Sequence, residues 1–508
     1  MRPLSAAVVR LAPLSALVVA ALATPAHAQM TVSGAGDPLV GVGTRCVIVP
    51  SPPERFTHEP FASISKILYL ERCKDGCTVN GAGVNDARSM TSAIPPPGQH
   101  AFAAFQNHLG ESGEAADEQW NQFVSCVREV YSYYDIQVTD QKPAAGLSYH
   151  LNLVSGTPTQ INLDASTLGI SPFSCNALDN VISFTFSQVH NRTSAEAYVK
   201  DLCWTATHEA GHAFSLEHAF EFTDGVSACN DPMSYPTGAC NPQRYFRQDQ
   251  VKCGGFSLEP CSCGATQSSH LKLLGVFGPG TSTVAPPVVT ITAPAAGEQL
   301  GVAVSANAGS KRGVHSLELL VNGHRWATAK GAPFGSNGQP NPSPYSLRPP
   351  DSLPGGVLDL SIRACDDIGV CTDSPTVTAM KGAPCTSADT CANGQRCDQG
   401  RCLWDPPVGE IGDECAFDQY CIEGLCRGTA ERQICTQPCI PGVADSCPLE
   451  GGFSCIQTAP GQGICFNEPD GGGCCQTAGS GSPPWAAFAF GVGGLLLLGR
   501  RRRRARRA

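Results

Sequence analysis

Three histidines and a glutamate stand at a spacing that can hold a metal ion and use it. They are His208, Glu209, His212 and His218, in the string HEAGHAFSLEH. Residues four apart on a helix lie just over one turn apart, so the imidazoles of His208 and His212 project from the same side. Both can bind one zinc ion, and Glu209 then lies beside a water molecule on that ion. The alternative for these two histidines is a solvated helix face.

A catalytic zinc site generally has three protein ligands and one water molecule. His218, six residues after His212, supplies the third ligand if the chain turns out of the helix near Ser215. Zinc in such a site lowers the pKa of the water to about 7. Glu209 can then take a proton from the water and pass it to a leaving group. The sequence therefore predicts one catalytic Zn²⁺ and metal-assisted hydrolysis.

The complete string resembles the zinc-binding motif of the metzincin metalloproteases, H-E-x-x-H-x-x-G-x-x-H. Ser215 stands where that family has a glycine, which permits a sharp turn more readily than serine. The resemblance implies hydrolysis of peptide bonds in a protein or peptide substrate, with Glu209 as general base. It also implies an α/β catalytic domain over residues 63–280, built from a twisted mixed sheet and two main helices.

A methionine-containing segment, DPMSY, begins thirteen residues after His218. It is similar to the Met-turn of the same family. The resemblance implies that Met233 lies beneath the three histidines. It also implies that Tyr235 can bind zinc and stabilise the transition state. Ordinary core packing for Met233 and a structural role for Tyr235 are the alternatives.

Cys46 is a candidate inhibitory thiol ahead of the catalytic region. The triplet Thr44-Arg45-Cys46 resembles the Arg-Cys part of the matrixin cysteine switch, in which a pro-segment thiolate binds the zinc, although the following Gly and Asp are missing. Thiolates are good zinc ligands, and residues 29–62 would then be a short pro-segment. A structural disulfide for Cys46, or a free thiol at Cys203 instead, are the alternatives.

Periodicity predicts the elements that position these residues. Thr193 and Glu196 form a T-x-x-E capping box that opens a helix, and apolar residues recur at helical spacing as far as Phe214. A second helix is expected from Ala115 to Tyr131. Strands are expected at 66–70, 136–138, 149–154 and 181–186.

The region 286–382 reads as a β-sandwich, with a hairpin turn at Asn322-Gly323 and a disulfide between Cys365 and Cys371. It resembles bacterial Ig-like surface modules, which act as spacers or binding modules. Twelve cysteines follow within 383–467, and we expect three units with two disulfides each, forming a stalk. No C-x₂-C spacing supports a metal site there.

The two ends of the chain predict export and anchoring. Residues 1–28 read as a signal peptide ending in Ala26-His27-Ala28. A Gly-rich linker over 468–484 contains Cys474 and Cys475, and an apolar transmembrane helix over 485–499 and an Arg-rich cytoplasmic tail over 500–508 follow. This tail resembles the myxobacterial sorting signal MYXO-CTERM. The resemblance implies processing near the two cysteines by a sorting protease and retention at the cell surface or outer membrane, with or without later release. A plain membrane anchor is the alternative.

Composition agrees with an exported protein. The chain has 508 residues and 27 cysteines, too many for a reducing compartment. Without the nine arginines of the terminal signals, 25 basic and 44 acidic residues remain, a net charge of −19 that disfavours nucleic acid as a partner. No residue pattern supports a structural Ca²⁺ ion.

We expect a secreted, surface-anchored zinc endopeptidase. The alternative is an adhesion or binding protein whose metzincin-like domain is inactive or incidental.

Overall fold

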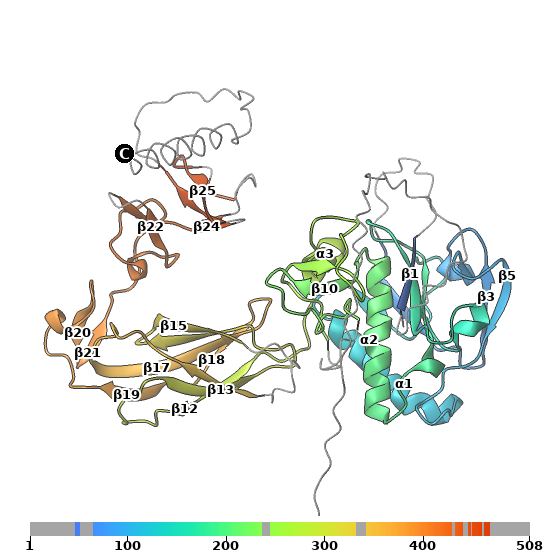
Figure 1. The fold of residues 1–508 in the computed structure, drawn as a ribbon, viewed down its shortest axis with the longest axis horizontal. Helices are drawn as coiled ribbons and strands as arrows, with labels where there is room; N and C mark the ends of the chain where they lie inside the picture. Colours follow the sequence, from blue (N-terminus) through green and yellow to red (C-terminus); the bar gives the residue numbers. More distant parts are fainter. Residues whose placement is uncertain are drawn as a thin grey trace, which may run out of the picture. The chain divides into compact units, whose positions relative to one another are not determined.

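The computed structural model describes residues 46–50, 64–235, 244–331, 342–428, 432–439, 446–448, 450–459 and 462–467. The chain is multidomain and mostly β, and it divides into two units (Figure 1). The first unit runs to His218 and includes 253–267 and 272–281; the second comprises 219–252, 268–271 and the chain from 282 onward. The predicted signal peptide, Cys474, Cys475, the transmembrane helix and the Arg-rich tail lie outside the described residues. Within those residues, no helix has the length and apolar character needed to cross a membrane.

A six-stranded mixed sheet forms the centre of the first unit. Its order is β1-β8-β9-β7-β2-β6, and all neighbouring pairs are parallel except β8 with β9. The strands are β1 (Cys46–Pro50), β2 (Ile67–Glu71), β6 (Gln137–Thr139), β7 (His150–Val154), β8 (Gly169–Phe173) and β9 (Ile182–Thr185). Apolar side chains of the middle strands are buried on both faces, as expected for strands covered on both sides.

Two long helices pack against each other in this unit: α1 (Asp117–Tyr131) and α2 (Ala195–Ala213) (Figure 1). A disulfide between Cys126 and Cys203 joins them. The free thiol considered at Cys203 is therefore wrong, because α1 presents a cysteine opposite it. The N-cap of α2 is Ser194, whose hydroxyl accepts from the Ala197 N–H, so the helix begins one residue later than the predicted capping box implies.

Smaller elements complete the first unit and lead into the second. A three-stranded sheet, β4-β3-β5, contains β3 (Cys77–Gly81), β4 (Thr91–Ser92) and β5 (Gly98–Phe102). A disulfide joins Cys73 to Cys77, the first residue of β3, and further disulfides join Cys175 to Cys263 and Cys253 to Cys261. A helix, α3 (Ser269–Phe277), and a strand pair, β10 (Ala219–Phe222) with β11 (Val251–Cys253), follow.

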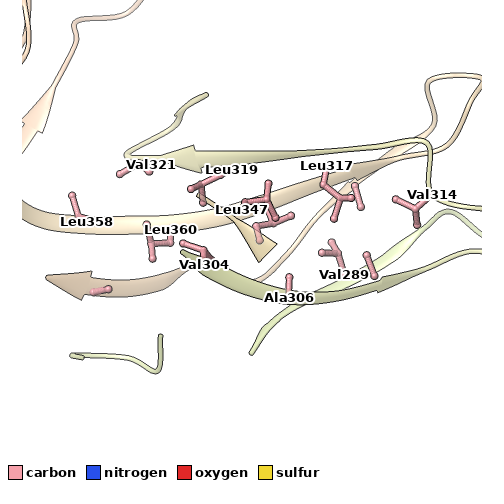
Figure 2. Close-up of a cluster of buried hydrophobic side chains, with 14 of the residues drawn as sticks. Val289, Val304, Ala306, Val314, Leu317, Leu319, Val321, Leu347, Leu358 and Leu360 are labelled. Carbon is pink, nitrogen blue, oxygen red and sulfur yellow. The ribbon is translucent and has the colours of Figure 1, made fainter. Parts of the chain in front are cut away.

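A β-sandwich forms the middle of the second unit. One sheet is β12-β13-β16 and the other is β15-β14-β17-β18, with β19 also pairing β17. The bounds are β12 (Val288–Ala293), β13 (Val304–Gly309), β14 (Ser316–Val321), β15 (His324–Lys330), β16 (Ser343–Leu347), β17 (Gly356–Cys365), β18 (Cys371–Asp373) and β19 (Val377–Lys381). Alternate residues of β14 and β17 point inward, and their leucines meet the valines and alanines of β12 and β13 in one core (Figure 2). The predicted Cys365–Cys371 disulfide is present.

Three small modules stapled by disulfides follow the sandwich. Each module has four cysteines and two crossed disulfides. The first cysteine pairs with the third, and the second pairs with the fourth. The pairs are Cys385–Cys397 and Cys391–Cys402, Cys415–Cys426 and Cys421–Cys435, and Cys439–Cys455 and Cys447–Cys465. Their strands are β20 (Arg396–Asp398), β21 (Arg401–Leu403), β22 (Cys426–Gly428), β23 (Gln433–Cys435), β24 (Pro438–Cys439), β25 (Ser454–Ala459) and β26 (Gln462–Phe466). The prediction of two disulfides in each of three units is confirmed.

Candidate metal centre

Three imidazole nitrogens converge at the end of α2. The Nε2 atom of His212 lies 2.9 Å from that of His208 and 3.1 Å from that of His218. His208 and His212 are fully buried, and His218 is partly exposed. The Nδ1 atom of His212 faces the Leu216 carbonyl at 2.7 Å, and because a carbonyl only accepts, this nitrogen carries the proton. The Nε2 atom of His212 therefore presents a lone pair to both neighbouring rings.

This donor set fits a zinc ion. Three imidazole nitrogens are ligands that zinc prefers, and a second hydrogen bond from each ring commonly fixes its orientation. Burial lowers the pKa of His212 well below its ordinary value, and His208 and His218 lower it further. Burial also lowers the pKa of His218. The rings of His212 and His218 are therefore neutral near pH 7, and the neutral imidazole is the form that binds metals.

A helix-ending turn brings His218 round to the other two histidines. The backbone of Ser215 is left-handed, with φ at 76°, and the Leu216 N–H donates to the Gly211 carbonyl at 2.9 Å. This pattern is a Schellman helix end, in which glycine is usual at the left-handed position. Serine adopts the same conformation here. The Nζ atom of Lys272 also donates to the Ser215 carbonyl at 2.8 Å, which holds the turn from outside.

Glu217 fixes the residue next to the third ligand. Its buried carboxylate accepts from the Ser262 N–H at 2.6 Å and the Cys263 N–H at 2.8 Å. The side chain of Gln267 bonds both the N–H and the carbonyl of Glu217, at 2.8 and 3.0 Å. The segment 261–267 is itself tied by the two disulfides at Cys261 and Cys263. His218 is therefore held through its neighbour by a cross-linked loop.

The carboxylate of Glu209 lies against β8. Glu209 is fully buried one residue after His208. A Cβ atom built on Gly169, the first residue of β8, would lie 2.5 Å from the Glu209 Oε1 atom. Only a glycine leaves room for the carboxylate at this point of the sheet.

Side chains from the sheet and from α1 hold α2 in place. The Tyr131 hydroxyl donates to the Thr207 carbonyl at 3.1 Å, and the Asn152 amide donates to the Ala206 carbonyl at 3.2 Å. Both contacts act on the turn just before His208. With the Cys126–Cys203 disulfide, they fix the rotation of the helix and hence the direction in which its histidines point.

The other predicted site residues are placed as follows. Met233 and Tyr235 belong to the second unit and are both buried. The Met233 N–H donates to the Asp231 carboxylate at 2.8 Å. Cys46 is the first residue of β1 and is the main-chain register partner of Gly169.

Several positioning residues were not predicted from the sequence. One is Gly169, whose lack of a side chain leaves room for Glu209. The others act through hydrogen bonds with main-chain atoms, and they are Glu217, Gln267 and Lys272. Such contacts depend on tertiary proximity and leave no periodic or spacing signal. The left-handed turn at Ser215 did have a signal, the need to bring His218 back towards the helix.

Comparisons with known proteins bear on the second unit. No curated protein matches the chain. Among solved structures, the chain is similar to the fibronectin(III)-like modules of CbhA from Clostridium thermocellum, with 21% identity over 18% of this chain and 94% of that chain and a TM-score of 0.14. Residues 287–370 match the family described as the bacterial Ig domain. The predicted Ig-like module is therefore confirmed over this range.

Proposed function

We propose that the chain is an exported, surface-anchored zinc endopeptidase. The observation that carries this proposal is the convergence of the His208, His212 and His218 rings, with the Glu209 carboxylate on the same buried helix end. Zinc bound by these rings would supply Lewis acidity and an activated water molecule. The Ig-like module fits a surface protein.

The residues of the chain have distinct roles in this proposal. Glu209 takes a proton from the attacking water and later gives it to the leaving amine. Tyr235 stabilises the oxyanion, and Met233 forms the floor below the three histidines, as the metzincin resemblance implies.

The strand that borders Glu209 supports a peptide as the substrate class. β8 pairs on its outer edge with β1, a five-residue extended segment of the same chain. An edge that accepts one extended segment through main-chain hydrogen bonds can accept another of similar shape. A protein or peptide substrate would then lie along β8, with a peptide bond near Glu209.

The test is Glu209→Ala in the exported protein. We expect the variant to keep its zinc and its fold and to lose casein-degrading activity, because the proton acceptor is gone while the ligands remain. Glu196→Ala is the matched control, since Glu196 lies on the same helix with an exposed side chain that pairs only with Lys200 among the described residues. Zinc is measured by elemental analysis, and undiminished cleavage by Glu209→Ala would sink the proposal.

The alternative is an adhesion or binding protein with an inactive or incidental metzincin-like domain. The match to the bacterial Ig domain is the observation that favours it. Wild-type protein without zinc, and without chelator-sensitive hydrolysis of casein, would support this alternative over the protease.

Cys46 is proposed as an inhibitory thiol in residues 29–62. The register of β1 supports this proposal, because Cys46 pairs with Gly169, where an added Cβ atom would meet the Glu209 carboxylate. An N-terminal strand here would also block the substrate's place along β8. Peptide mass spectrometry of the exported form tests the switch: we expect Cys46 as a free or zinc-bound thiol, and finding it in a disulfide would eliminate this role.

Anchoring at the cell surface is proposed from the C-terminal residues. A sorting protease would act near Cys474 and Cys475, and the apolar segment 485–499 would provide the membrane contact before release or retention.

A further inference from the structure

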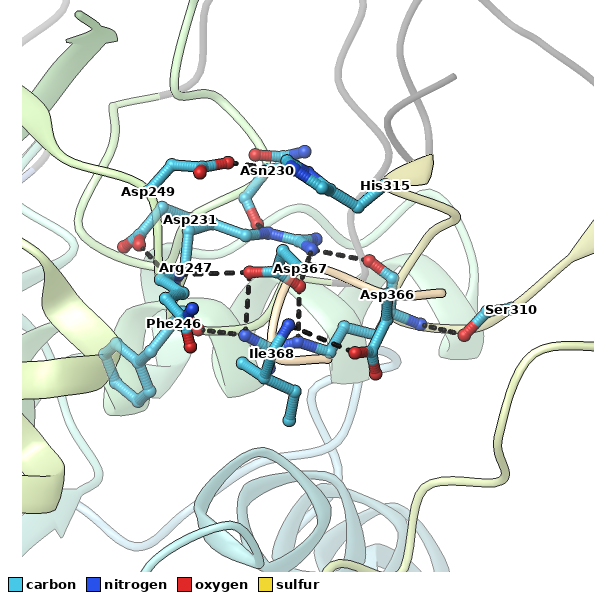
Figure 3. A network of polar contacts seen from close by, with 12 residues as sticks. Asn230, Asp231, Phe246, Arg247, Asp249, Ser310, His315, Asp366, Asp367 and Ile368 are labelled. Atoms are coloured by element: carbon cyan, nitrogen blue, oxygen red, sulfur yellow. Dashed lines mark hydrogen bonds and ion pairs between the residues drawn. The ribbon is translucent and has the colours of Figure 1, made fainter. Parts of the chain in front are cut away.

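A buried network of charges joins two parts of the second unit (Figure 3). The carboxylate of Asp367, on the Ig-like module, accepts from the Nε and Nη2 atoms of Arg312 at 2.6 and 3.0 Å. It also accepts from the Nη1 atom of Arg247 at 3.3 Å and from the Gln248 N–H at 3.1 Å. The side chains of Arg312, Arg247 and Asp367 are at most 6% exposed.

The same arginine reaches the segment that contains Met233. The Arg247 N–H donates to one oxygen of Asp231 at 2.8 Å, and the Met233 N–H donates to the other oxygen at 2.8 Å. The Arg247 Nε atom donates to the Asn230 carbonyl at 3.2 Å. Asp231 is fully buried. The conformation of residues 230–235 is therefore tied, through Arg247, to a carboxylate of the Ig-like module.

Charged side chains take part in this connection. A cavity of about 600 Å³ adjoins the network and is lined by Asn230 and Arg247 on one part and by Arg312, His315 and Asp367 on the other. Burial would raise the pKa of Asp367, but the two guanidiniums hold that pKa well below its usual range, so the carboxylate is charged. Removing one member of a buried ion network leaves the others uncompensated, so its members act together.

We propose that the Ig-like module acts as a buttress for the candidate site, with Asp367 as a positioning residue. Asp367 acts through Arg247 and Asp231 on residues 230–235, which include Met233 and Tyr235. The proposal rests on the proposed function, in which that segment forms part of the site. The module is then required for hydrolysis and is more than a spacer.

The experiment compares Asp367→Asn with wild type in the complete exported protein. Asparagine keeps the size of the side chain and removes its charge. Asp373→Asn is the matched control, because Asp373 forms an exposed ion pair with Arg363 on the same module. Three quantities are measured: deuterium uptake of the peptide 228–235, zinc content, and kcat and KM on a fluorogenic casein-derived peptide.

For Asp367→Asn we expect faster exchange in the peptide 228–235, unchanged zinc, and kcat lowered about tenfold with KM changed less than about twofold. The control should match wild type in all three. A general loss of structure would raise exchange across the whole module and would not be confined to this peptide.

The outcomes separate this proposal from the proposed function. If wild type does not hydrolyse peptides, the proposed function fails, and the exchange measurement still decides whether Asp367 holds the segment. Wild-type exchange in Asp367→Asn would show that Asp367 does not hold residues 230–235, which overturns the proposal. Faster exchange with wild-type kcat would show that holding this segment does not matter for hydrolysis, which overturns the role of the module in the reaction. Should Asp367→Asn fail to fold, Arg247→Lys is measured in the same way, because lysine keeps the charge and loses the guanidinium contacts to the Asn230 carbonyl and the Asp367 carboxylate. Wild-type exchange and kcat in that variant overturn the proposal.

Discussion

At the residue scale, the position of Glu209 depends on the absence of a side chain at Gly169. A Cβ atom there would lie 2.5 Å from Oε1 and 2.6 Å from Cγ of Glu209. We expect Gly169→Ala to displace the carboxylate, and a shift of about 1 Å in a catalytic group costs about 100-fold in rate. The prediction is a kcat on a casein-derived peptide lowered by about that factor, with zinc content unchanged because Gly169 is not a ligand.

Gly83→Ala is the control for this substitution. No atom lies within 4 Å of a Cβ built on Gly83, and its φ is one that alanine adopts readily. Wild-type kcat in Gly169→Ala would mean that hydrolysis does not depend on where Glu209 places its carboxylate.

At the scale of elements, the third histidine depends on the loop that binds Glu217. The Glu217 carboxylate accepts two main-chain hydrogen bonds from residues 262 and 263, and the loop is fixed by disulfides. We expect Glu217→Ala to loosen His218 and to weaken zinc binding about 10- to 100-fold, the usual effect of removing a group that orients a metal ligand. Competition with a chromophoric zinc chelator measures this affinity.

Glu259→Ala is the comparison for that measurement, since Glu259 lies on the same stretch of chain with an exposed side chain. It should bind zinc as tightly as wild type. Equal zinc affinity in Glu217→Ala would show that the turn at Ser215 alone places His218.

Periodicity was enough to predict the two long helices of the first unit, α1 and α2. The predicted helix from Ala115 matches α1 within two residues, and its tryptophan, phenylalanine and valines are buried as expected. The strand β8 was missed, because the sequence GISPF has a glycine and a proline that argue against a strand. Yet this strand borders Glu209. Its glycine is needed for close approach to the helix, so local propensity was overridden by tertiary contact.

Cysteine pairing shows the same limit. Four cysteines permit three pairings, and spacing does not choose among them. The crossed pairing within each small module, and the Cys126–Cys203 link across 77 residues, follow from which strands and helices lie side by side. The turn at Ser215 was expected from the ligand spacing, whereas its stabilisation by Lys272 was not.

At the scale of the whole molecule, the two units are stabilised differently. The small modules of the second unit rely on paired disulfides around few apolar residues, as expected for segments too short for a full core. The first unit has a large core that also buries His150, whose pKa is lowered by burial. Acid should therefore affect the first unit before the disulfide-stapled modules, and calorimetry should resolve separate transitions.

His150, on the central strand β7, makes the stability of the first unit depend on pH. Its ring is fully buried against Ser183, and burial lowers its pKa to about 3. An unfolded histidine has a pKa of about 6.5, so between these values the unfolded chain binds the extra proton, and stability falls as the pH falls. The stability that neutral His150 confers is present above about pH 6.5, and about 2 kcal/mol of it is lost by about pH 5.

We expect His150→Gln to lack this part of the acid dependence. Calorimetry measures the unfolding transition of the first unit in both proteins near pH 7 and near pH 5, and the change between the two pH values is compared. The pH-independent cost of the substitution cancels in this comparison. The acid response of the zinc ligands cancels too, because both proteins have the same ligands. An equal acid dependence in the two proteins would show that His150 is not held neutral by the core.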